Sequence, residues 1–193
     1  LIGEGGEGND DTITVQNGTH TFTGGAASDF ASFVVEDGGT AMMGALFEGD
    51  PAGGGYAFSN VDNLTVNDGG TLYIDQSTTL VVDNNFTQQA GGTLEFYLGA
   101  PGGADFSDLT GNVVAGDGDY GQIVVNGTVT LDGAVVGFLD PAFADANPGL
   151  DQVLYNDVIV ANGGISGDFS TVALIADSSL FELDDIIDGN TVD

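Results

Sequence analysis

Carboxylates supply most of the chemically reactive side chains in this sequence. It contains 30 acidic residues, one histidine, no lysine, no arginine and no cysteine, which gives a formal net charge of −30. Carboxylate oxygens can ligate divalent cations or transfer protons as general acids and bases. Thiol nucleophiles and Schiff-base lysines are excluded. Cation binding and carboxylate catalysis are therefore the two kinds of chemistry to consider.

Several Asp-rich segments could supply calcium ligands. Residues 5–10 (GGEGND) resemble half of the calcium-binding nonapeptide of the hemolysin type, and residues 117–119 (DGD) lie in a Gly-rich stretch. Calcium takes about six to eight oxygens, more than any one of these segments provides, so solvated acidic turns are the alternative interpretation. The candidate calcium ligands are Asp10, Asp11, Asp117, Asp119, Asp184, Asp185 and Asp188.

Carboxylate pairs are also the catalytic groups of glycoside hydrolases. The sequence lacks the Arg, Lys and Trp residues that usually orient a sugar, and His20 lies in an alternating pattern, GTHTF, without a nearby acid. No acid and base constellation is therefore evident. We expect that the protein is not an enzyme and that His20 is a surface or stacking residue.

The charge also limits the partners. Binding a phosphate backbone requires cationic side chains, so nucleic acid is excluded, and anionic membrane surfaces are disfavoured by the same repulsion. No stretch approaches the roughly 18 consecutive apolar residues of a membrane helix, so we expect no membrane insertion. Divalent cations are the expected partners of such an acidic surface.

The elements that must position these side chains are predicted to be strands. Short β-branched runs separated by turn residues recur along the chain, whereas helical periodicity is hard to find. The 33 glycines supply the positive-φ positions that tight turns need. The clearest strand runs are residues 12–15, 33–35, 64–66, 80–82 and 123–125.

A turn motif repeats along the chain, in which Asp, Asn or, in one copy, Ala is followed by one or two glycines and then Thr. Its threonines are spaced by roughly 20 to 35 residues, which is typical of a solenoid whose windings carry insertions. The expected architecture is an all-β, parallel β-helix in which about three short strands form each winding. An antiparallel β-sandwich or jelly roll is the alternative fold. The repeated threonines are Thr19, Thr40, Thr71, Thr93 and Thr128.

The whole chain, 1–193, is expected to form a single β-solenoid domain. Residues 1–11 are predicted to be an acidic, Gly-rich N-terminal segment. Residues 48–56 and 99–121 are rich in Gly, Pro and Asp and are predicted to be loop insertions.

Four blocks between residues 91 and 169 resemble the passenger region of bacterial autotransporters. They are GGTLEF at 91–96, DYGQIVVNG at 119–127, VTLDG at 129–133 and GGISGDF at 163–169. The resemblance implies a right-handed parallel β-helix on the surface of a bacterium. That family includes adhesins, proteases and inert stalks, so the fold alone specifies no activity.

The expected function is that of a secreted structural protein. Open winding ends favour self-association, so a subunit or stalk of an extracellular filament, surface layer or matrix is the leading hypothesis. The alternative is an adhesin-type binding module that recognises glycans or neighbouring cells through its loop insertions. A third hypothesis is a calcium-responsive domain that folds on secretion.

Overall fold

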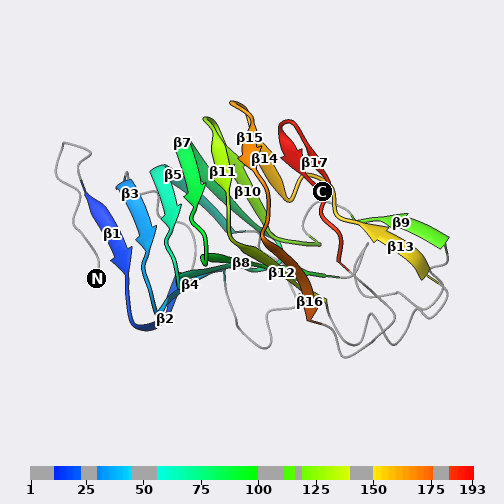
Figure 1. The fold of residues 1–193 in the computed structure, drawn as a ribbon, viewed down its shortest axis with the longest axis horizontal. Helices are drawn as coiled ribbons and strands as arrows, with labels where there is room; N and C mark the ends of the chain where they lie inside the picture. Colours follow the sequence, from blue (N-terminus) through cyan, green and yellow to red (C-terminus); the bar gives the residue numbers. More distant parts are fainter. Residues whose placement is uncertain are drawn as a thin grey trace.

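The structure, a computed structural model, is all-β. It describes residues 11–22, 30–44, 56–99, 111–115, 119–139, 150–175 and 183–193, and within these ranges it contains strands and no helix. Most strands belong to two large sheets, and in each sheet the strands follow one another along the long axis of the molecule (Figure 1).

The first sheet takes strands from the whole length of the chain. They are β1 (Thr12–Val15), β3 (Phe30–Val35), β5 (Tyr56–Val66), β7 (Thr78–Gln88), β10 (Gln122–Val125), β11 (Val129–Leu131), β14 (Ile159–Ala161), β15 (Ile165–Gly167), β17 (Ile187–Asp188) and β18 (Thr191–Val192). The long strand β7 pairs with both β10 and β11. The earlier windings therefore contribute one long strand to this sheet, β5 or β7, whereas the later windings contribute two shorter strands.

The second sheet takes the intervening strands. They are β2 (Gly18–Phe22), β4 (Gly39–Met43), β6 (Thr71–Ile74), β8 (Thr93–Leu98), β12 (Ala134–Leu139) and β16 (Thr171–Ile175). A separate pair consists of β9 (Gly111–Val114) and β13 (Leu150–Leu154).

Pairing between neighbouring strands is almost entirely parallel. The chain passes alternately through the two large sheets, and each passage adds one strand, or two in the first sheet from β10 onward, beside those of the previous passage. Among the described strands, antiparallel ladders occur only where β18 pairs with β14 and β17. The antiparallel sandwich alternative is therefore wrong, and the five predicted strand runs lie in β1, β3, β5, β7 and β10.

The repeated turn motif is confirmed for its first four copies. Their threonines lie opposite one another in the parallel register of β2, β4, β6 and β8, in the order Thr19, Thr40, Thr71 and Thr93. The glycines before them also form a ladder: the Gly38 N–H donates to the Gly69 carbonyl and the Gly69 N–H to the Gly91 carbonyl, each over 3.1 Å. Gly69 has a φ of 73°, which an L side chain rarely adopts.

The prediction for the fifth threonine is wrong. Thr93 lies opposite Ala134 rather than Thr128, and Ala134 in turn lies opposite Thr171. Thr128 instead precedes β11, where its N–H and hydroxyl donate to the side-chain oxygen of Asn85 over 3.0 and 2.8 Å. Thr128 therefore leads into β11 of the first sheet, and the strand that lies beside β8 in the second sheet is the next one, β12.

The core lies between the two large sheets and consists of stacked side chains. In the parallel register an inward position in one strand lies beside the inward position of the next, as in Leu80, Ile123 and Ile159. All three are at most 1% exposed. This stacking of apolar side chains buries apolar area continuously along the axis, and burial of apolar area is the main favourable contribution to folding.

The expected insertions differ from the structure at their boundaries. Tyr56 begins β5, and residues 48–55 lie outside the described residues. The stretch 99–121 is not a plain loop, because it contains β9, which pairs with β13. Of the N-terminal segment, only Asp11 is described, and it directly precedes β1.

The two ends of the structure differ. At the N-terminal end, β1 pairs with β3 and β2 with β4, and within the described residues neither has a neighbour on its other side. At the C-terminal end, the antiparallel β17–β18 hairpin closes the first sheet (Figure 1). One end therefore presents open backbone edges, and the other is partly capped.

Candidate functional site

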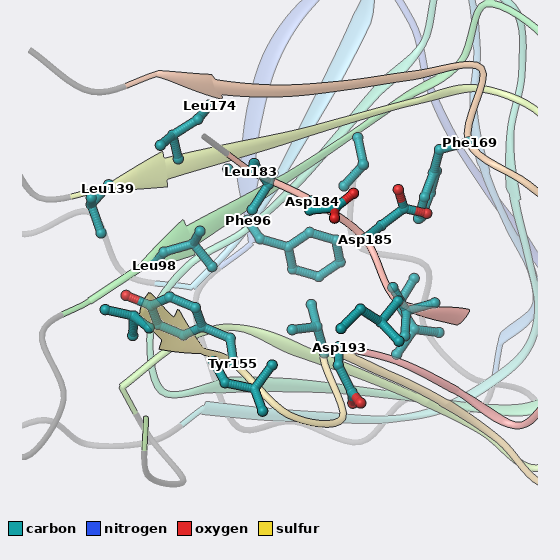
Figure 2. A pocket seen from close by; sticks show the side chains of 18 residues that line it. Phe96, Leu98, Leu139, Tyr155, Phe169, Leu174, Leu183, Asp184, Asp185 and Asp193 are labelled. Atoms are coloured by element: carbon teal, nitrogen blue, oxygen red, sulfur yellow. The ribbon is translucent and has the colours of Figure 1, made fainter. Parts of the chain in front are cut away.

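A pocket of about 330 Å³ opens at the C-terminal end of the structure (Figure 2). Strands β8 and β12, the segment around β13 and the residues that lead into β17 all contribute to its walls. The lining is mainly apolar and includes Phe96, Leu98, Leu139, Tyr155, Phe169 and Leu174.

A glycine interrupts an inward stack in the wall of the pocket. Ile74, Phe96, Gly137 and Leu174 lie opposite one another in four successive strands of the second sheet. A Cβ atom built on Gly137 would lie 2.7 Å from the Leu98 side chain. Side chains of Leu98, Leu183 and Leu174 therefore pack directly against the Gly137 backbone. The Phe96 ring lies in the middle of the lining in Figure 2.

Three carboxylates line the same pocket. Asp184 and Asp185 precede β17, and Asp193 follows β18. The backbone of the hairpin joins the two segments, since the Ile186 N–H donates to the Asp193 carbonyl over 3.2 Å and the Asp193 N–H to the Ile186 carbonyl over 3.0 Å. Asp184 and Asp185 lie on one side of the Phe96 ring and Asp193 on the other (Figure 2), and the Asp193 Oδ1 accepts a hydrogen bond from the Asp157 N–H over 2.8 Å. Asp184 is exposed and the other two are half-buried, so they form a rim that faces both the pocket and water.

The Asp185 carboxyl is half-buried next to other acidic side chains. Partial burial raises its pKa above the ordinary value, and repulsion by Asp168 and Asp184 acts in the same direction. The sequence offers no Lys or Arg to pair with it. The rim therefore favours any cation that can reach it.

Tyr155 fixes the wall of the pocket next to β13. Its hydroxyl donates to the Gly99 carbonyl over 2.9 Å, and its ring contacts the Tyr120 ring edge-on at 5.5 Å. The Tyr120 hydroxyl donates to the Asn156 carbonyl. Burial raises the pKa of Tyr155, so its phenol stays protonated at neutral pH and serves as a donor rather than a base.

The structure separates the predicted calcium ligands. Asp184 and Asp185 lie together at the pocket, whereas Asp188 lies exposed in β17 and outside the lining. Asp11 precedes β1, and Asp119 directly precedes Tyr120. Asp10 and Asp117 lie outside the described residues. Within the described ranges, no three acidic or histidine side chains are grouped as a metal site would require.

Sequence reasoning missed Asp75, a buried carboxyl of the turn after β6. Its Oδ1 accepts hydrogen bonds from the Gln76 N–H over 2.9 Å and from the Tyr73 hydroxyl over 3.3 Å. Burial raises the pKa of Asp75, and these two hydrogen bonds partly oppose the rise. The available signal was the position of an acid directly after the apolar run Leu72–Ile74, and the arrangement is that of a structural turn.

No family model, curated protein or solved structure matches this chain. In the part of the chain that is described, we find no helix long and apolar enough to cross a bilayer. Functional proposals therefore rest on the fold and on the side chains themselves.

Proposed function

We propose that the chain is a right-handed parallel β-solenoid of the autotransporter-passenger type and that it serves as an extracellular structural subunit, a stalk or filament segment that associates with itself. The parallel, in-register strands of the two large sheets support the solenoid. Right-handed crossovers are the rule for parallel strands joined within one sheet, which supports the handedness.

The open edges of β1 and β2 carry the proposal. The Ser32 N–H donates to the Asp11 carbonyl and the Glu36 N–H to the Val15 carbonyl. Because backbone direction alternates along a strand, residues 11, 13 and 15 face β3, and the N–H and C=O groups of Thr12 and Thr14 face outward. Among the described strands none pairs with these groups, so they could pair with a strand of another copy.

The neighbouring strand β2 repeats the arrangement. Gly18 donates to the Gly38 carbonyl and Gly44 donates to the Phe22 carbonyl, so the backbone groups of Thr19 and Thr21 face outward. Neither β1 nor β2 contains a carboxylate, although the chain has 30. A neutral edge of this kind is suited to strand addition by a second copy.

The chemistry of the chain is consistent with an inert role outside the cell. The phenol of Tyr155 and the carboxyl of Asp75 are both engaged by backbone groups, as structural side chains are. The absence of Lys and Arg removes every trypsin cleavage site, and the absence of Cys makes the fold independent of redox conditions. Such a chain suits a persistent extracellular scaffold.

Edge-blocking variants test the proposal. Thr14→Pro with Thr21→Pro removes two outward N–H donors, whereas Thr14→Val with Thr21→Val changes the same side chains and keeps the donors. The parent and the valine variant should form concentration-dependent linear or paired particles in electron micrographs and in light scattering. The proline variant should be monomeric with unchanged far-UV circular dichroism.

Two results would overturn self-association through this edge. One is a parent protein that stays strictly monodisperse and monomeric at high concentration in the presence of calcium. The other is a folded proline variant that assembles as well as the valine variant. The adhesin alternative depends on insertions 48–56 and 99–121, most of whose residues lie outside the described ranges, and no observation in the structure favours it.

A further inference from the structure

We propose that the C-terminal pocket binds a small hydrophobic ammonium, that is, a primary amine carried on a short alkyl or aryl body. The apolar body would occupy the pocket beside Phe96, and the ammonium would lie at the carboxylates of Asp184 and Asp185 on its rim. The inference is independent of self-association, because β1 and β2 lie at the opposite end of the structure.

The shape and the lining of the pocket select an apolar body. A volume of about 330 Å³ lies at the lower end of the range for small-molecule sites. Phe96, Leu98 and Leu139 are each at most 6% exposed, so they make a packed wall rather than a loose surface. Burial of apolar ligand area against such a wall contributes roughly 25 cal/mol per Å² before the entropy of association is subtracted.

The charge of the rim selects a cation. Three side-chain carboxylates line the pocket, and the sequence has no Lys or Arg that could neutralise them. An ammonium can donate up to about three charge-assisted hydrogen bonds to carboxylate oxygens. Anionic ligands of the same shape would be repelled, and neutral ones would leave the negative charges without a countercharge.

The half-buried position of Asp185 strengthens this argument. Burial raises the pKa of Asp185, which means that its charged form is poorly solvated in the empty pocket. A bound cation stabilises that charged form and returns the pKa toward its ordinary value. Ligand binding and proton release from Asp185 are then coupled.

A titration with three isosteric probes tests the proposal. Hexylammonium, hexanol and hexanoate share an alkyl chain and differ in charge. The folded protein at pH 7 should bind hexylammonium saturably in calorimetry, hexanol at least about tenfold more weakly, and hexanoate not at all. In methyl NMR spectra, the signals of Leu98, Leu139 and Leu174 should shift together with the hexylammonium titration.

Variants with matched controls locate the site. Asp184→Asn with Asp185→Asn should weaken hexylammonium binding at least about tenfold and leave hexanol binding unchanged. Asp11→Asn with Asp132→Asn removes the same charge from exposed positions elsewhere and should have no effect. Gly137→Leu should abolish binding of both probes, and Gly137→Ala, which adds one methyl group beside Leu98, should weaken both.

Three results would overturn the inference. Equal affinity for hexylammonium and hexanol would show that the carboxylates do not select a cation. Unchanged affinity in the Asp184 and Asp185 double variant would place the ammonium elsewhere. Methyl shifts confined to residues outside the lining would show that the alkyl chain does not enter the pocket.

Discussion

The side-chain amide of Gln88 donates a hydrogen bond of 2.8 Å to the backbone carbonyl of Ala134, which lies 46 residues later in the chain. The same Nε2 donates to the Gly92 carbonyl over 3.0 Å. Gln88 is only 1% exposed, so this amide joins two successive windings from inside the core. A buried donor with two carbonyl acceptors specifies register where apolar contacts alone do not.

Replacement of Gln88 by glutamate should destabilise the fold strongly at neutral pH. An ionised carboxylate at this position would be buried and would face two carbonyl oxygens without a donor, which costs about 3 kcal/mol or more. The free energy of unfolding in urea measures the loss, part of which should be recovered in acid. Gln89→Glu is the matched control, since Gln89 is exposed and the charge change is the same. Equal losses in the two variants would contradict the assigned role of Gln88.

A ladder of side-chain amides should also contribute measurably to stability. The Asn126 amide donates to Asp83 over 3.1 Å and accepts from the Asn162 amide over 3.1 Å, so it connects three windings. Asn126→Ala breaks both bonds and Asn162→Ala only one. We expect losses of about 1–2 and about 0.5–1 kcal/mol respectively in urea unfolding. A larger loss for Asn162→Ala would contradict the ladder.

Stability should increase on mild acidification. The carboxyls of Asp75, Glu95 and Asp185 have folded-state pKa values raised mainly by burial, so the folded state binds their protons more tightly than the unfolded state. This contribution is fully present below the ordinary pKa of 3.8 for Asp75 and is lost as the pH rises through the raised value. Tm measured from pH 7 downward should therefore rise.

Asp75→Asn isolates one source of that pH dependence. The Asn side chain keeps an oxygen acceptor for the Gln76 N–H and the Tyr73 hydroxyl but carries no charge. The variant should have a higher Tm than the parent at pH 7 and a flatter profile. Asp132→Asn, at an exposed position, should leave the slope unchanged. A steeper profile for Asp75→Asn would show that the sign of the Asp75 contribution is wrong.

Strand positions could be predicted from the sequence because successive windings repeat the same pattern of an apolar strand followed by a glycine turn. An apolar, β-branched run followed by Asp-Gly-Gly-Thr identifies β4 and β6, and the structure confirms their register. The segment Asn126-Gly127-Thr128 has a similar sequence, but its glycine is required for a different reason. Gly127 is not among the residues with positive φ, and it is required because a Cβ there would collide with the Asn84 carbonyl. The sequence alone does not separate these two uses of glycine.

The pocket could not be predicted, because it depends on long-range register. Gly137 interrupts the run AVVGFL of β12, and a glycine within a strand indicates only a bulge or a close approach. Its place in the pocket wall becomes clear only once Phe96 and Leu174 are aligned on either side of it. The sequence predicts Asp184, Asp185 and Asp188 as calcium ligands, whereas in the structure Asp184 and Asp185 line the pocket and Asp188 does not.

Stability should rise with ionic strength, because a net charge of −30 without a single Lys or Arg is self-repelling. Raising NaCl from about 10 mM to about 0.5 M shortens the Debye length from roughly 30 Å to a few Å, and Tm should increase over this range.

A comparison of calcium with NaCl distinguishes charge screening from specific calcium binding. At matched ionic strength, diffuse association predicts a small extra gain from calcium, whereas a site among candidates such as Asp117 and Asp119 predicts saturation at low calcium and reversal by chelator. Asp117→Asn with Asp119→Asn should remove the saturable component and leave the NaCl response intact. A Tm that is insensitive to both salts would show that repulsion among the carboxylates does not limit the stability of this fold.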